Sequence, residues 1–147
     1  MAKNEELIRL LNQGLELEHA AFVQYLSQAE LIDGLNAEPI IGRLREIAED
    51  EKEHQKKFRN LIGDYLFGVP STKIAQTYEA KTIEEILRIN LREEKKAVDF
   101  YSKIMEKIKE EKENLPYAFW QLEHEVRHII IDEQEHIAEL SILLAEK

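Results

Sequence analysis

The chain has 147 residues, 44% of them hydrophobic and 34% charged, and its formal net charge is −10 at neutral pH. This length fits a single domain, residues 1–147, with a hydrophobic core. The absence of cysteine excludes disulfides, thiolate metal sites and thiol nucleophiles. The acidic balance argues against binding of nucleic acid, whose phosphates require lysine and arginine, and it favours the approach of cations.

No segment predicts secretion or membrane insertion. The first residues, Met-Ala-Lys-Asn-Glu-Glu, lack the basic and then apolar run of a signal peptide. No apolar stretch approaches the roughly 18 residues that a membrane-crossing helix needs. We therefore expect a soluble cytoplasmic protein without a membrane partner.

Breaker residues divide the chain into four expected helices. Glu, Lys, Leu, Ile and Ala dominate the composition, and there are only 5 Gly and 3 Pro, which favours helices over a sheet. Gly34 and Pro39 mark the first turn, and the segment Thr82–Glu85 resembles a capping box that opens the third helix. The expected helices cover about 4–33, 38–67, 82–114 and from there to 145.

The connection from about residue 68 to residue 81 carries no helical period and is long for a helical bundle. A link of this length can traverse the bundle, so the second and third helices should run parallel. The predicted fold is therefore an all-α four-helix bundle with one long crossover between helices 2 and 3.

Two of the expected helices carry the step Glu-x-x-His on their apolar side. In the second helix Glu51 and His54 fill two slots of a hydrophobic stripe with alternating steps of three and four, and in the fourth helix Glu133 and His136 do the same. A glutamate and a histidine three residues apart share one helix face. Both can therefore reach one metal ion while the second glutamate oxygen reaches another.

The other two helices each place one glutamate in the middle of the stripe. Glu18 and Glu94 are each followed, seven residues later, by a tyrosine, Tyr25 and Tyr101, which either packs in the core or holds a ligand carboxylate. Each buried carboxylate costs several kcal/mol unless it is neutralised. Two divalent cations would balance the four negative charges. The predicted metal ligands are Glu18, Glu51, His54, Glu94, Glu133 and His136.

The Glu-x-x-His step is not diagnostic alone, because it also occurs at Glu16…His19 and Glu125…His128. Neither of these pairs lies on an apolar stripe. Glu125 would also lie only about 15 Å along the fourth helix, whereas Glu133, at about 27 Å, is level with the glutamate of the third helix. The histidines expected at the surface or in an interface are His19, His124 and His128.

Together these residues resemble the ferritin-like di-iron carboxylate proteins, especially rubrerythrin and bacterioferritin, over nearly the whole chain. The segment 46–54 is similar to the second helix of a rubrerythrin and the segment 132–136 to its fourth, while Glu18 and Glu94 fall where the family's other two helices carry their ligands. The resemblance implies a ferritin-like four-helix bundle. It also implies two iron ions as the cofactor, although manganese or mixed occupancy suits similar nitrogen and oxygen ligands.

The same resemblance implies redox chemistry in which two Fe(II) ions are oxidised together by dioxygen or hydrogen peroxide. Glu51 and Glu133 correspond to bridging ligands of this catalytic centre, and Glu18 and Glu94 to terminal ligands. Each of the two histidines would supply one nitrogen ligand. Tyr25 matches the family's tyrosine near the metals.

Three departures from the family pattern shape these expectations. No Cys-x-x-Cys rubredoxin domain is present, so an external electron donor is expected. Lys52 stands where bacterioferritin has its haem-ligating methionine, and the chain ends 11 residues after His136, so we expect neither haem nor a storage cage. Ala97 replaces the additional third-helix glutamate of rubrerythrins, which argues against their type of metal movement. A homodimer is expected by analogy.

The sequence thus predicts a rubrerythrin-like di-metal oxidoreductase that oxidises Fe(II) with peroxide or dioxygen. One alternative is an iron-handling or ferroxidase protein. Another is a non-enzymatic helical scaffold or partner-binding module with a structural metal site.

Overall fold

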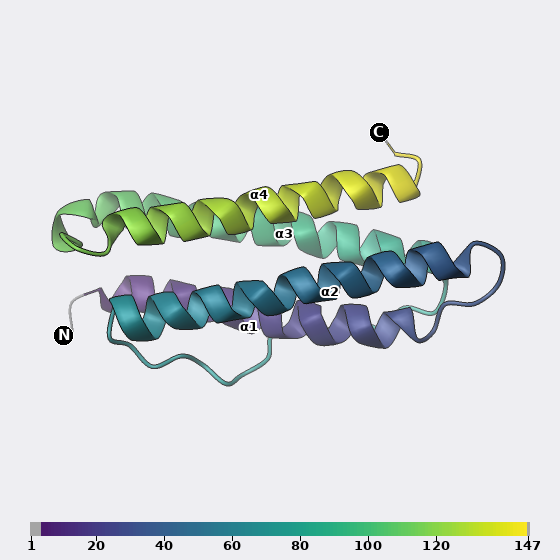
Figure 1. Ribbon diagram of the computed structural model, residues 1–147, viewed down its shortest axis with the longest axis horizontal. Helices are drawn as coiled ribbons and strands as arrows, with labels where there is room; N and C mark the ends of the chain where they lie inside the picture. The colour runs from purple at the N-terminus through teal and green to yellow at the C-terminus, as the bar shows by residue number, and fades with distance from the viewer. Residues whose placement is uncertain (1–3, 147) are drawn as a thin grey trace.

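Four long helices form the bundle in a computed structural model that describes residues 4–146 (Figure 1). A π-helical turn, Leu61–Tyr65, extends the second helix, and a 3₁₀ turn, Lys112–Asn114, follows the third. The helices are α1 (Glu5–Ala29), α2 (Ala37–Asn60), α3 (Ile83–Glu110) and α4 (Phe119–Leu143).

The topology confirms the predicted single crossover. α1 packs along α2 and α3 packs along α4, while α1 also contacts α3 and α2 contacts α4. The chain between residues 66 and 82 traverses the length of the bundle, and α2 and α3 consequently run in the same direction (Figure 1). None of the helices formed by residues 4–146 is apolar over a length that could cross a membrane.

Local backbone conformation explains where the helices begin and end. α1 ends at Ala29, four residues before the predicted end, and the following turn places Gly34 at φ 90° and Asn36 at φ 66°, both in the left-handed region. The side chain of Thr82 caps α3 as predicted by accepting a hydrogen bond from the Glu85 amide at 3.1 Å.

The crossover lies along α1 and is held to it by hydrogen bonds. It runs in the same direction as α1, because successive crossover residues bond successively later positions of that helix. The bonds are Ser71 N to Asn12 Oδ1 (2.7 Å), Ala75 N to the Glu16 carbonyl (3.1 Å) and Tyr78 N to Gln24 Oε1 (2.7 Å). This docking covers the flank of the bundle next to the α1–α3 seam.

Buried apolar side chains form two separate clusters along the bundle. Leu11, Phe58 and Ile104 belong to the first, and Ile47 and Leu140 to the second. A fully buried aliphatic side chain contributes about 1.5–3 kcal/mol relative to exposure. Between these stabilising clusters lies a layer of buried polar side chains, which all four helices supply.

Candidate metal centre

The polar layer contains all six residues that the sequence predicts as ligands. α1 supplies Glu18, α3 supplies Glu94, and α2 and α4 each supply a glutamate and a histidine from one Glu-x-x-His step. No member of the set is more than 3% exposed. The set is Glu18, Glu51, His54, Glu94, Glu133 and His136.

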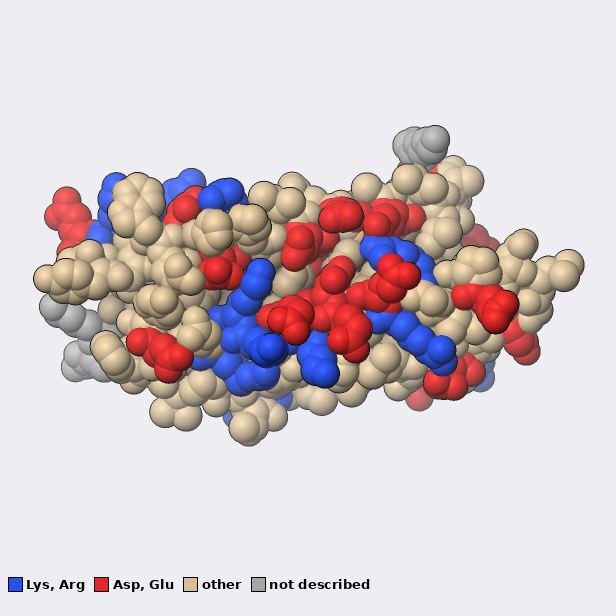
Figure 2. Space-filling view, in the orientation of Figure 1, with Lys and Arg blue, Asp and Glu red and all other residues tan. Residues whose placement is uncertain are grey.

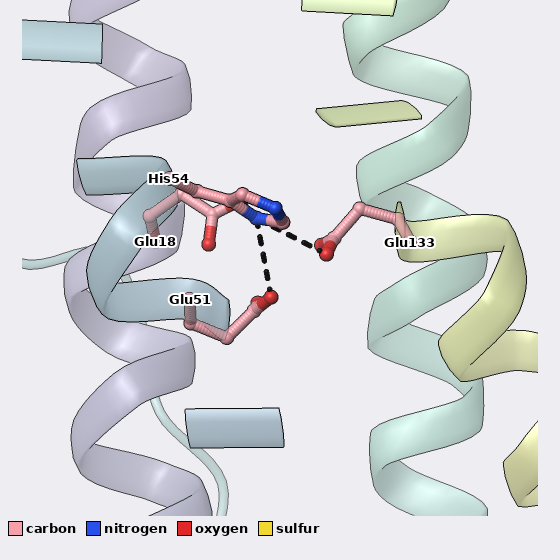
Figure 3. A group of neighbouring side chains, drawn as sticks. All are labelled: Glu18, Glu51, His54 and Glu133. Carbon is pink, nitrogen blue, oxygen red and sulfur yellow. Dashed lines mark ion pairs between the residues drawn. The ribbon is translucent and has the colours of Figure 1, made fainter. Parts of the chain in front are cut away.

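The six side chains form two overlapping groups. In the first, one ligand atom from each of Glu18, Glu51, His54 and Glu133 lies within 4.8 Å of the others (Figure 3). The second group, with the same spacing, contains Glu51, Glu94, Glu133 and His136. Glu51 and Glu133 belong to both groups, so each can join two cations, whereas each of the other four residues reaches only one.

The distances around each histidine show how the groups converge. The Nδ1 atom of His54 lies 3.3 Å from an oxygen of Glu51, 3.3 Å from Glu133 and 3.4 Å from Glu18. The Nδ1 atom of His136 lies 3.2 Å from Glu133, 3.4 Å from Glu94 and 3.6 Å from Glu51. Each Nδ1 atom therefore has oxygens from three carboxylates within 3.6 Å.

Each of the six residues has one buried atom without a hydrogen-bond partner. Among residues 4–146, seven buried side-chain atoms have no partner, and six of them belong to this cluster, one from each residue. An unsatisfied buried polar group costs about 1–3 kcal/mol, and charged groups cost more. Two divalent cations, one in each group of nitrogen and oxygen ligands, would satisfy these atoms.

The outward nitrogens of both histidines contact aspartates from the opposite helix. His54 Nε2 lies 2.9 Å from Asp132 of α4, and His136 Nε2 lies 2.8 Å from Asp50 of α2. An aspartate that accepts the Nε2 proton leaves the Nδ1 lone pair directed inward, where a cation would need it. The sequence interpretation missed this role, although each aspartate directly precedes a predicted glutamate ligand.

Two buried tyrosines hold Glu18 and Glu94, the carboxylates that each belong to only one of the two groups. Tyr25 donates its hydroxyl hydrogen bond to Glu94 at 2.8 Å, and Tyr101 donates to Glu18 at 2.7 Å. Burial raises the pKa of both hydroxyls well above the usual value, and the nearby carboxylates raise it further. Both tyrosines therefore remain protonated donors, the second of the two roles left open for them.

An amide network that the sequence did not reveal lies beside the centre. Asn90 accepts a hydrogen bond from Gln24 at 2.9 Å and donates to Gln28 at 2.7 Å. Gln24 accepts a hydrogen bond from the backbone amide of Tyr78, and Gln28 donates one to the backbone carbonyl of Tyr78. The network thereby fixes the crossover against the α1–α3 seam.

A small cavity reaches the centre at this seam. Its volume is about 80 Å³, and Glu51, Glu94 and Glu133 line its inner end. The small side chains Ala21 and Ala97, from α1 and α3, leave the space open. The remaining wall residues include Ala20, Gln24 and Glu93, with Gln76 of the crossover.

Burial and mutual repulsion perturb the acids and bases of the metal-free centre. Burial raises the pKa of Glu51 and Glu133 well above the usual range, and the neighbouring carboxylates raise it further. Burial alone would lower the pKa of His54, but the facing Glu18 carboxylate and other acids outweigh it and raise the value. The same opposition raises the pKa of His136 to about 10. These raised pKa values favour protons on the two glutamates and the two histidines whenever no cation is bound.

Residues 8–146 match the family model of the ferritin-like domain. The chain belongs to the ferritin-like family. This ferritin-like protein is similar in structure to a ferritin-like, di-iron carboxylate protein from Bacillus anthracis, with a TM-score of 0.89 and 25% identity over 98% of this chain and 99% of that chain. The predicted fold and the family resemblance are confirmed.

Two bacterioferritins show the same fold at lower identity. The protein from Rhodobacter capsulatus, whose structure has a metal-free dinuclear site and haem iron, gives a TM-score of 0.83 and 22% identity over 99% of this chain and 87% of that chain. The BfrA bacterioferritin from Mycobacterium tuberculosis gives 0.86 and 22% over the same shares. No curated protein matches the ferritin-like chain.

The raised pKa values predict that the metal-free protein loses stability as pH rises. The stabilising protonation of Glu51 and Glu133 is complete below their unfolded value of 4.5 and is lost as pH rises through the raised folded value. That of His136 is complete below 6.5 and lost as pH rises through about 10. Each unit by which a folded pKa is raised corresponds to about 1.4 kcal/mol.

Thermal unfolding in the presence of a chelator should therefore show a melting temperature that falls between about pH 5 and about pH 10. The metal-loaded protein is the control and should not show this fall, because cations then replace the protons. A melting temperature of the metal-free protein that rises over the same range would contradict the assignment.

Proposed function

We propose that this ferritin-like protein is a di-iron carboxylate redox protein that oxidises Fe(II) with hydrogen peroxide or dioxygen. The observation that carries the proposal is that six buried residues, each with one unpartnered atom, form two groups of possible ligands that share Glu51 and Glu133. When bound, an iron pair would supply two electrons to the oxidant. Glu18 and Glu94 would hold one ion each, in the positions fixed by their tyrosine hydrogen bonds.

The cavity supports a small oxidant over an organic substrate. Its volume of about 80 Å³ is well below the roughly 300–1,000 Å³ of most small-molecule pockets. It opens on the two shared glutamates, where a small molecule would meet both ions. Tyr25, also in its wall, would contribute by keeping Glu94 in place as a hydrogen-bond donor.

The second candidate function is a ferroxidase, which takes up Fe(II) as its substrate, oxidises it and releases the product. Acidic side chains gather over the middle of the face formed by α2 and α4, with lysine and arginine side chains on both sides of them (Figure 2). Asp50 of α2 and Asp132 of α4 contact the two histidines of the centre, and their side chains are 48% and 40% exposed. This acidic face would attract cations toward the centre.

The proposed redox cycle also needs a source of electrons. An external electron donor would be needed to return oxidised iron to Fe(II), because the chain contains no cysteine for a rubredoxin-type centre. We propose the cytoplasm as its location and a homodimer as its assembly, on composition and family analogy respectively. Haem is not part of the proposal, because position 52, where bacterioferritin has its haem-ligating methionine, holds an exposed lysine that has no thioether.

The first test combines metal content with oxidation. Anaerobic loading with Fe(II) should give about two iron ions per chain, and a Glu51→Ala/Glu133→Ala variant should lose both. Stopped-flow absorbance should then show oxidation of the loaded iron by peroxide or dioxygen. Retention of that iron through repeated reduction supports the redox enzyme, and oxidation of many further Fe(II) ions per chain supports the ferroxidase.

A ferrous protein inert to both oxidants would overturn both functions. If its melting temperature also fell on chelation, the structural metal site of a scaffold protein would be the better description.

Loss of an aspartate behind a histidine should weaken the adjacent metal site. We expect Asp132→Ala and Asp50→Ala each to lower metal affinity by about 10–100-fold, because the histidine then loses the partner that fixes its ring. Asp132→Asn should restore part of the loss, since an amide oxygen can still accept the Nε2 proton. Equilibrium dialysis with Fe(II) under anaerobic conditions measures the effect.

Glu135→Gln is the matched control, because it removes one negative charge from an exposed position of the same helix as Asp132. Equal weakening by this control and by Asp132→Ala would show a general charge effect and would contradict a specific role for the aspartate.

Filling the cavity should slow the oxidant without removing the metal. Ala97→Leu places a larger side chain in the cavity wall, and we expect unchanged iron loading with oxidation slowed by about tenfold, equivalent to about 1.4 kcal/mol in the barrier. Ala138→Leu, at an exposed position of α4, is the control and should keep the parent rate. Unchanged oxidation in the Ala97 variant, with helicity intact, would exclude this cavity as the route.

A further inference from the structure

Two histidines outside the centre lie side by side on α4. His124 and His128 are four residues apart, which places them on one face of the helix. Both side chains are exposed, and their ring centroids are 4.3 Å apart. Two imidazoles this close on a rigid helix can bind the same ion without rearrangement of the backbone.

The ring nitrogens of this pair are available to a ligand. His54 and His136 contact aspartates, and His19 Nδ1 lies 2.7 Å from the Lys73 carbonyl. Across residues 4–146, in contrast, neither ring of the pair has a side-chain hydrogen bond or an ion pair. Each of the other three histidines thus has one nitrogen engaged, whereas in this pair neither nitrogen of either ring has a side-chain partner among residues 4–146.

The charged side chains next to the histidine pair already form ion pairs with one another. Glu125, which shares a Glu-x-x-His step with His128, lies 3.5 Å from Lys57 and accepts a hydrogen bond from Gln121 at 3.4 Å. Arg127 bonds Glu123 at 2.9 Å. Glu125 is therefore occupied by Lys57 and Gln121, and the two imidazoles remain as the ligands of this site.

From this geometry we propose that His124 and His128 chelate one late first-row divalent ion, with zinc and copper as the best matches. Zn²⁺, Cu²⁺ and Ni²⁺ accept imidazole nitrogen readily, whereas Mg²⁺ and Ca²⁺ prefer oxygen. Water would complete the coordination, because both rings face solvent. The acidic surface and the net charge of −10 favour the approach of any cation.

The chelate is independent of the central site. His128 lies eight residues before His136, or about 12 Å along α4, and the two sites share no residue. Its ligand set also differs, with two nitrogens and no carboxylate. Metal binding by His124 and His128 can therefore be tested independently of the iron chemistry proposed above.

Zinc titration followed by calorimetry tests the pair. We expect the parent to bind one more Zn²⁺ per chain than the His124→Ala, His128→Ala and double variants. All three substitutions lie at exposed positions and should leave the fold unchanged, which circular dichroism would check. His19→Ala is the matched control and should retain the parent stoichiometry, because that histidine is already bonded to the crossover.

The central site can be removed from the measurement as well. In a Glu51→Ala/Glu133→Ala background, Cu²⁺ should give an electron paramagnetic resonance signal split by two imidazole nitrogens, and His128→Ala should abolish that pattern. Identical zinc stoichiometry and affinity in the parent and the double histidine variant would overturn the proposal. Binding of one zinc ion between two chains would also overturn it, because the chelate is formed within one helix.

Discussion

The whole bundle depends on four carboxylates buried in one layer at the middle of its core. Two apolar clusters stabilise the fold on either side of this layer, but they cannot neutralise it. A buried charge without a partner costs several kcal/mol, which is a large fraction of a typical stability of about 5–15 kcal/mol. Positive charge must therefore enter the layer, either as protons on His54, His136, Glu51 and Glu133 or as cations.

The arrangement of the surrounding residues favours cations over protons as the final occupants. Protons could neutralise Glu51 and Glu133, but a proton on a histidine Nδ1 can bond only one or two of the three carboxylates that lie within 3.6 Å of it, whereas a cation can bind all of them at once. Each histidine is held by an aspartate of the opposite helix, so α2 and α4 fix one another's ligands. Such preorganisation before any ion arrives distinguishes a binding site from a buried charge cluster that merely tolerates protonation.

The sequence predicted the six clustered residues because glutamate and histidine interrupt apolar stripes on helices whose period is easily recognised. Glu51 and His54, for example, fill core positions, and only compensation can explain a charge there. Asp50 and Asp132 could not be assigned in this way, because they lie off the stripe and their role depends on a contact across two helices. The role of Gln24 and Asn90 was missed because it depends on hydrogen bonds between α1 and α3, which the periodicity of a single helix does not show.

The two sides of the polar layer offer different surroundings to different reactants. The α1–α3 side has a small cavity whose walls include Ala21 and Ala97, and it suits a small uncharged oxidant. The α2–α4 side carries exposed acids, including Asp50 and Asp132, and it suits a cation (Figure 2). The cavity lies between α1 and α3, whereas the exposed aspartates lie on α2 and α4. The oxidant and the cation would therefore approach the centre from different sides of the bundle. Under the proposed function, the fold therefore separates the delivery of metal from the delivery of oxidant while both reach the shared glutamates.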